Sequence, residues 1–318
     1  MPERPFVPSD KLKRLIDCDN ALLLVMNRFG ISLGFGEKTV EAVCSEQEID
    51  RDTFLAVANY ICGRDWRIED ISLPSIISYL KKAHSYFLDF MLPTIRRRLI
   101  EAIDCSGGDN IALLIIKFYD EYVTEVRSHM EYEDTTVFPY VECLLNGRKR
   151  KDYSIDGFAR KHNHIDLKLK ELKNIIVRYF TQDGNNLLYS ALFDIINCEN
   201  DLNSHCSVED NVFVPAVRAA EEKAGESPDG QDSKTGSGNG DARQESLSER
   251  EKEIITCVAK GMSTKEIADK LFISVHTVTT HRRNISSKLQ IHSAAGLTIY
   301  AIVNGLLSME EIRNLNEA

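Results

Sequence analysis

The sequence predicts an all-α protein: a four-helix up-down bundle, with a small helical domain before it and a separate four-helix domain after it. The first observation is periodicity, because apolar residues recur every three or four positions over four long segments of the chain. The second is a Gly-, Ser- and Asp-rich stretch over 223–245, which is typical of a flexible linker. The third is the length of 318 residues, which suffices for two or three domains.

The predicted domains are residues 1–70, 71–222 and 246–318, joined across the linker 223–245. The four helical segments of the bundle are residues 77–103, 111–145, 158–180 and 187–222. Short turn-rich connections are expected between them at residues 104–110, 146–156 and 181–186. Long helices joined by short connections favour an up-down bundle.

Composition limits the possible functions. The net charge is −10, yet residues 246–307 carry eight Lys and Arg against five Asp and Glu, which is about +3. Nucleic-acid binding is therefore compatible with the last domain. There is no apolar run long enough to span a membrane and no secretion signal, so we expect a cytoplasmic protein without membrane contact. The eight cysteines form no C-x-x-C pair, which argues against a zinc ribbon or a disulfide framework.

An internal repeat indicates a metal site in the bundle. HMEYEDTTVFP begins at His129 and HCSVEDNVFVP begins at His205, and both contain H-x-x-x-E-D with a proline ten residues after the histidine. Residues four apart lie on the same face of a helix, so His129 pairs with Glu133 and His205 with Glu209. The first and third helices add His84 and His162, giving four imidazoles and two carboxylates, a set that suits two metal ions.

The alternative is that these residues form surface His–Glu pairs. Two buried carboxylates without a cation would each cost several kcal/mol, which favours the metal site. His164 lies about 200° around the helix from His162, so only one of them faces the centre, and we select His162. Asp134 and Asp210 directly follow the two glutamates; we expect them to face solvent or neighbouring helices rather than to support the ligands. Iron, zinc and manganese all suit these donors.

Residues 20–222 resemble the hemerythrin-like superfamily, and more closely the di-iron proteins that repair iron centres (the RIC or YtfE/ScdA group). The resemblance is carried by the six predicted ligands and by three prolines that follow the histidines, Pro93, Pro139 and Pro215. It implies two non-haem iron ions with an oxo or hydroxo bridge, held by four histidines and bridged by Glu133 and Glu209. Oxygen-carrying hemerythrins use a fifth histidine, so oxygen storage is disfavoured. The group usually has adjacent cysteines where this chain has Gly34 and Phe35.

The last domain has the pattern of a helix-turn-helix. Residues 264–271 are predicted to form a scaffold helix capped near Ser263, and residues 275–289 a second helix capped by Ser274. Spacing places Val278, Ile285 and Leu289 in the core. The side chains expected on the exposed faces of the second helix, where they could enter a major groove, are Thr279, Thr280, Arg282 and Arg283.

This domain closely resembles the LuxR/NarL-type DNA-binding domain, through motifs such as Leu247-Ser248, Lys265-Glu266-Ile267-Ala268 and Thr277-Val278. The resemblance implies double-stranded DNA as partner and a dimer contact through the last helix, about residues 294–307. The small positive charge also favours binding as a homodimer. The implied base-reading residues are Thr279, Thr280 and Arg283, and the implied phosphate contacts are Lys265, Thr277 and Lys288. We do not expect His281 to bind metal.

Together the domains predict a transcription regulator whose di-iron bundle responds to redox state, O2, peroxide or nitric oxide. A small diatomic or peroxide molecule would then be the ligand of the metal site. No catalytic residue is predicted. The alternatives are a di-iron enzyme or iron-centre repair protein with an autoregulatory DNA-binding domain, and a bundle stiffened by structural metals that recognises a protein partner.

Overall fold

The structure is a computed structural model that describes residues 4–103, 110–148, 153–159, 166–179, 186–223, 247–308 and 311. These residues are helical, with no strand among them beyond an isolated bridge between Lys11 and Thr39. The all-α prediction is therefore confirmed. None of the described helices is long and apolar enough to cross a membrane.

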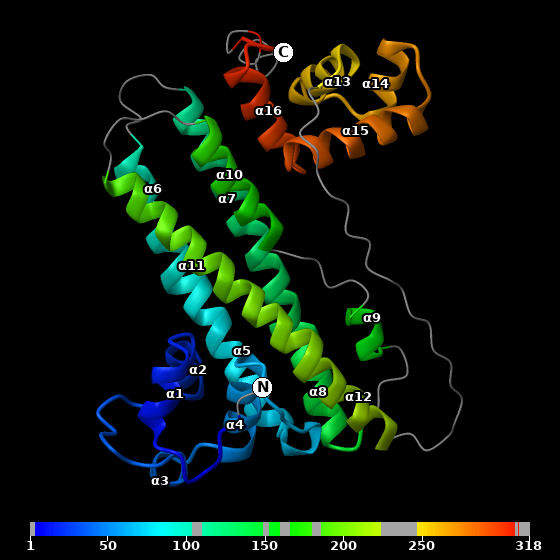
Figure 1. Cartoon of the computed structure of the whole chain (residues 1–318). Coiled ribbons are helices and arrows are strands. Elements are labelled where there is room, and N and C mark those ends of the chain that lie inside the picture. The colour runs from blue at the N-terminus through cyan, green and yellow to red at the C-terminus, as the bar shows by residue number, and fades with distance from the viewer. Residues whose placement is uncertain are drawn as a thin grey trace. The chain divides into compact units, whose positions relative to one another are not determined.

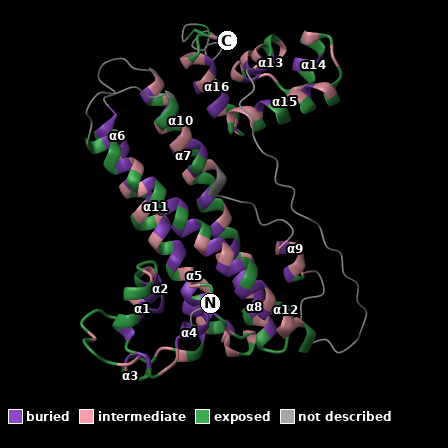
Figure 2. Cartoon of the chain, in the orientation of Figure 1, coloured by how far each residue is buried: buried purple, intermediate pink, exposed green. Residues whose placement is uncertain are grey.

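The helices form two compact units, and Figure 1 labels them along the chain. The first unit comprises Met1–Pro93, Glu125–His164 and Cys198–Asp229. The second unit comprises Thr94–Thr124, Ile165–Asn197 and Gly230–Ala318. In both units the buried residues repeat along one side of the helices, as amphipathic packing requires (Figure 2).

The N-terminal segment of the first unit begins with α1 (Leu12–Cys18), α2 (Leu22–Phe29), α3 (Val40–Glu46), α4 (Arg51–Ile61) and the short 3₁₀ helix η1 (Ile68–Asp70). Local sequence sets their limits, because the side chains of Thr39 and Asp50 cap α3 and α4, and Gly30 ends α2 at a φ of 84°. Residues such as Leu22 and Phe54 share one apolar core with bundle residues such as Phe213. The segment is thus packed onto the bundle helices of the first unit.

Three of the predicted long helices contain a π-helical segment. The first continuous helix consists of α5 (Leu73–Ser85), η2 (Tyr86–Met91) and α6 (Leu92–Ala102). The second consists of α7 (Asn110–Tyr132), η3 (Glu133–Val137) and α8 (Phe138–Leu145). The third consists of α11 (Asn186–Val208), η4 (Glu209–Phe213) and α12 (Val214–Lys223). Each π segment ends two residues before a proline, namely Pro93, Pro139 or Pro215. Proline cannot donate a backbone hydrogen bond and crowds the preceding turn, and the wider π turn accommodates it. The sequence analysis predicted the long helical segments but not the π turns within them.

The third predicted helix is described in two pieces, α9 (Ile155–Ala159) and α10 (Asp166–Tyr179). The residues between α9 and α10 lie outside the described part of the chain, so one continuous helix over 158–180 stays a prediction.

The last four helices of the second unit are α13 (Glu249–Ala259), α14 (Thr264–Leu271), α15 (Val275–Leu289) and α16 (Ala294–Val303). Ser263 and Ser274 cap α14 and α15 as predicted, while α16 ends earlier than the predicted residue 307. An apolar core that includes Ile254, Val278 and Ile285 belongs to these helices alone. This core stabilises the four helices as a domain.

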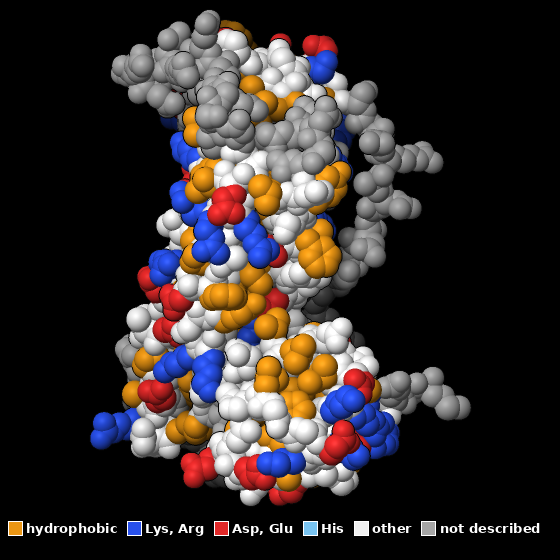
Figure 3. Space-filling model, turned by 90° about the vertical axis from the view of Figure 1, so that its left-hand side faces the viewer, with side chains coloured by type: hydrophobic (Ala, Val, Ile, Leu, Met, Phe, Trp, Pro, Cys, Tyr) orange, Lys and Arg blue, Asp and Glu red, His pale blue; other side chains and the backbone are white. Residues whose placement is uncertain are grey.

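The surface seen in Figure 3 mixes basic and acidic side chains, with apolar ones between them. No extended band of one charge is visible among the described residues on that face.

Candidate metal centre and DNA-binding surface

Four buried side chains of the first unit meet at one point. One ligand atom from each of His84, Glu133, His205 and Glu209 can be chosen so that all lie within 4.8 Å of one another. Each glutamate is the first residue of a π segment, and His129 and His205 lie one turn earlier in α7 and α11. The π turns therefore occur where the predicted carboxylates enter the cluster, a placement common at functional sites.

The geometry around Glu133 is that of a carboxylate between two imidazoles. Its Oε2 lies 3.1 Å from His84 Nε2, and its Oε1 lies 3.1 Å from His129 Nε2. Glu209 Oε1 lies 3.0 Å from His205 Nε2 and 3.9 Å from His84 Nε2. Imidazole nitrogen and carboxylate oxygen thus surround a common point, as they do in metal sites.

Burial makes this cluster costly without a cation. His84, Glu133, His205 and Glu209 are each at most 1% exposed. Nε2 of His84 and Nε2 of His205 lie close to carboxylate oxygens, but neither atom forms a hydrogen bond within the described residues, and His205 Nδ1 forms none either. Buried polar atoms are normally satisfied, and a cation between these donors would satisfy them and offset the carboxylate charges. The residues present therefore fit a metal ion.

His129 lies at the edge of the cluster, with its side chain 14% exposed. His162 and the alternative His164 lie outside the described residues, so the fourth imidazole stays a prediction.

Asp134, which was expected to face solvent or a neighbouring helix, contacts the neighbouring helix at His84 and so is placed to support a predicted ligand. Its Oδ1 lies 3.0 Å from His84 Nδ1, while the ring of Phe138 stacks on His84 at 5.6 Å between centroids. These contacts fix the orientation of the imidazole and leave Nε2 directed toward the cluster. Asp210, the equivalent residue of the repeat, is exposed.

Burial lowers the pKa of His84, but the carboxylates of Asp134, Glu133 and Glu209 outweigh it and raise that pKa to about 11. Without a metal ion His84 is therefore protonated at neutral pH. A cation bound at Nε2 takes the place of that proton.

The predicted DNA-reading residues lie on α14 and α15. Thr279, Thr280 and Arg283 are exposed on α15, and Lys265 is exposed on α14. Val278 and Ile285 are fully buried on the opposite side of α15, and Leu289 is partly buried against the same core. The helix thus presents one polar face to solvent, as base reading in a major groove requires.

Three predicted surface residues are engaged within the domain. Lys288 Nζ lies 3.1 Å from the carboxylate of Glu251, which is almost fully buried. Thr277 is partly buried and shares a hydrogen bond of 2.8 Å with the Ser274 hydroxyl. Arg282 was expected to be exposed, but it is only partly so and donates to the Thr264 hydroxyl. A phosphate contact by Lys288 would compete with its ion pair.

Comparison with known proteins finds two families in the chain. Residues 75–217 match the "Hemerythrin HHE cation binding domain", and residues 245–301 match "Bacterial regulatory proteins, luxR family". The chain therefore carries a hemerythrin-like domain and a LuxR-type helix-turn-helix domain. This is the fusion that the two resemblances predicted.

Relatives in curated collections match the LuxR-type domain. The "Oxygen regulatory protein NreC" of Staphylococcus carnosus (strain TM300) and that of Staphylococcus aureus (strain JH9) are each 49% identical over 61 residues. The match covers 19% of this chain and 28% of each relative, so the chain spans less than a third of those proteins. No solved structure matches the chain.

A buried ion pair that the sequence did not reveal joins the N-terminal segment to the hemerythrin-like domain. Arg28 of α2 donates to Asp201 of α11 at 2.6 Å, and both side chains are less than 10% exposed. Asp201 lies one turn before His205, and the Arg28 guanidinium lies 5.2 Å from the ring of Phe87, which contacts His205. The pair fixes the N-terminal segment next to the helix that carries His205 of the candidate metal centre. The one available signal was the spacing of Asp201, His205 and Glu209 at four residues.

Proposed function

We propose that this protein is a transcription regulator in which a di-iron centre in the hemerythrin-like domain controls DNA binding by the LuxR-type domain. The observation that carries the proposal is the buried cluster of two carboxylates and two imidazoles, in a chain that also holds an exposed recognition helix. In this proposal residues 1–70 and 71–222 sense, residues 223–245 link and residues 246–318 bind DNA. The proposed ligands are His84, His129, Glu133, His162, His205 and Glu209.

The position of Glu133 supports two metal ions rather than one. Its two oxygens face the nitrogens of different histidines, which is the arrangement of a carboxylate that bridges two cations. Glu209 differs, because its Oε1 alone lies near His205 and, at 3.9 Å, near His84. Iron, when bound, supplies a change of oxidation state or an open position for O2, peroxide or nitric oxide.

DNA recognition is proposed to use Thr279, Thr280 and Arg283 for bases and Lys265, Thr277 and Lys288 for phosphates. The domain has few positive charges, so two copies are needed for useful affinity, and a homodimer is expected on DNA. The name of the NreC relatives associates a related DNA-binding domain with oxygen regulation, which supports a regulatory role.

The test measures metal and DNA binding together. Protein purified without oxygen is expected to contain about two iron ions and to change its visible spectrum on exposure to air or nitric oxide. Its affinity for a duplex selected from a random pool is then measured in the reduced, oxidised and nitrosylated forms at fixed salt. An affinity that differs at least about fivefold between forms supports metal-gated regulation. Equal affinity in all forms would reject it, and zinc in place of iron would exclude redox sensing.

A further inference from the structure

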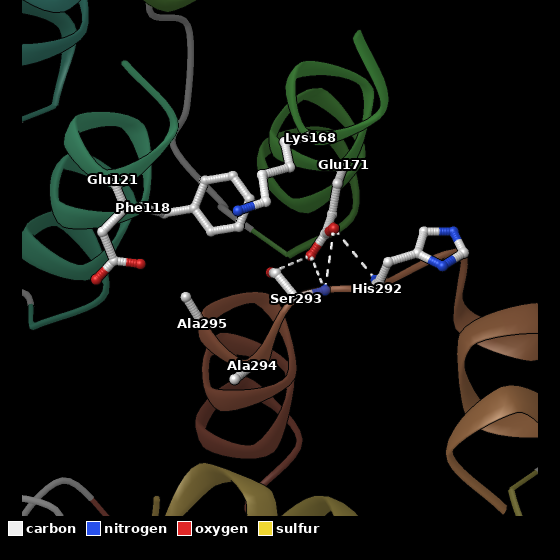
Figure 4. Close-up of a pocket in the computed structure, with 8 residues that line it drawn as sticks. All are labelled: Phe118, Glu121, Lys168, Glu171, His292, Ser293, Ala294 and Ala295. Atoms are coloured by element: carbon white, nitrogen blue, oxygen red, sulfur yellow. Dashed lines mark hydrogen bonds between the residues drawn. The ribbon is translucent and has the colours of Figure 1, made fainter. Parts of the chain in front are cut away.

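Within the second unit, Glu171 of α10 contacts the start of α16 (Figure 4). Its carboxylate accepts hydrogen bonds from the backbone N–H groups of His292 and Ser293, at 3.1 and 3.3 Å, and from the Ser293 hydroxyl at 2.5 Å. Glu171 is only 2% exposed. A buried carboxylate is strongly stabilised by several donors at a helix N-terminus, so this contact is directional and specific.

The local sequence of the LuxR-type domain leaves room for this carboxylate. Gly296 lies in the first turn of α16, and a Cβ added there would lie 2.1 Å from Glu171 Oε1. The same Cβ would lie 2.8 Å from Ile291 Cγ2, so glycine also serves the packing of its own domain. Glu171 can approach the helix closely because position 296 has no side chain.

A second contact lies two turns further along α10. Arg178 donates from Nη1 to the backbone carbonyl of Leu289 at 3.2 Å. Leu289 is the last residue of α15, where carbonyl groups lack partners within the helix. Helix α10 thus presents an anion to the N-terminus of α16 and a cation to the C-terminus of α15, and both charges complement the helix dipoles.

Burial of Ile299 shows that the contact extends along α16. Leu297 and Ala301 belong to the core of the LuxR-type domain, and Ile299 lies about 200° from Leu297 around the helix. Ile299 is nevertheless 1% exposed and is not part of that core. Helix α16 packs against α13 and α10, so α10 covers the side of α16 that faces away from its own domain.

We propose that this face of α10, defined by Glu171 and Arg178, is a docking surface for the LuxR-type domain of the same chain and that docking lowers DNA affinity. The docked domain keeps Thr279, Thr280 and Arg283 exposed, so docking restrains the pairing of two domains through α16 rather than hiding the base-reading residues. The inference rests on the proposed function, because it names the contact that a change at the metal centre would have to release.

The docking contact is tested by hydrogen exchange in the full-length protein. Glu171→Gln keeps the shape of the side chain but places an NH2 group among donors. It is expected to speed exchange of the His292 and Ser293 amides by about tenfold or more. Glu101→Gln changes an exposed glutamate of α6 in the same unit and should leave these rates unchanged. Unchanged rates in Glu171→Gln would overturn the docking surface.

DNA binding separates this inference from the proposed function. Glu171→Gln is expected to bind the selected duplex about 5- to 50-fold more tightly than the unaltered chain does. Glu101→Gln is expected to bind it with the same affinity as the unaltered chain. If Glu171→Gln binds the duplex more tightly, and the affinity of the unaltered chain does not depend on the metal state, the docking surface is retained and metal gating is rejected. If the DNA affinity of the unaltered chain depends on the metal state, and Glu171→Gln does not change that affinity, autoinhibition by docking is rejected and metal gating is retained. Crosslinking of 171 to 293 only between two copies would overturn docking within one chain.

Discussion

The metal centre and the LuxR-type domain are specified in different ways. Each of the four helices of the LuxR-type domain begins at a serine whose side chain accepts a hydrogen bond from the third residue of that helix. The candidate metal centre instead joins residues as far apart as His84 and Glu209, and its proposed ligands come from different helices. Local sequence signals therefore define the LuxR-type domain, whereas the candidate metal centre depends on how distant helices pack.

The LuxR-type domain and the candidate metal centre also differ in the kind of side chain that they bury. The LuxR-type domain buries an apolar core, whereas the candidate metal centre buries carboxylates and imidazoles whose desolvation a bound cation would offset. Removing a ligand should therefore affect metal binding and leave the LuxR-type domain folded. Removing a core side chain from the LuxR-type domain should destabilise that domain and leave metal binding unchanged.

The largest effect is expected from Glu209→Ala. If Glu209 is the bridging ligand that we propose, its loss should lower metal affinity by more than about 100-fold, because even supporting residues contribute 10- to 100-fold. Metal content is measured by mass spectrometry after iron loading without oxygen, and α15 is followed by hydrogen exchange. Glu222→Ala, at an exposed glutamate of α12, should keep its metal. Two full metal equivalents in Glu209→Ala, and in the parallel Glu133→Ala, would show that the ligand assignment is wrong.

Ile285→Ala tests the other side of the comparison. The cavity left by this fully buried side chain should destabilise the LuxR-type domain by about 3 kcal/mol. Hydrogen exchange of α15 in urea measures this loss, while the fluorescence of Trp66, the single tryptophan, follows the first unit. Val275→Ala removes methyl groups from a side chain that is 50% exposed and should cost less than about 0.5 kcal/mol. A fall in metal content in Ile285→Ala would contradict the independence of the two regions.

The same contrast explains which features the sequence could predict. The starts of α14 and α15 were predicted to the residue because Ser263 and Ser274 are local caps. The π segments were missed, since three prolines in periodic helices did not show how the backbone would accommodate them. The contact of Asp134 with His84 and the pair of Arg28 with Asp201 depend on tertiary packing, which no spacing within one helix reveals.

Asp134→Asn tests whether support of the ligands matters. The amide still reaches His84 Nδ1 but no longer carries a charge, so metal affinity should fall about tenfold with the fold retained. The affinity is measured by competition with a chelator. Asp89→Asn, at an exposed carboxylate of η2, should bind metal like the unaltered chain. Equal affinities in the two variants would mean that Asp134 has no supporting role.

The smallest effect, Ser263→Ala, sharpens the local side of the comparison. Ser263 and Glu266 form a reciprocal capping box at the start of α14, and its loss should destabilise the LuxR-type domain by about 1 kcal/mol. Ser287→Ala, at an exposed serine inside α15, should change stability by less than about 0.5 kcal/mol. Because the metal centre lies in the other unit, the cost of Ser263→Ala should be the same in a Glu209→Ala background. A cost that differs by more than about 0.5 kcal/mol between the two backgrounds would show that the regions are coupled in stability.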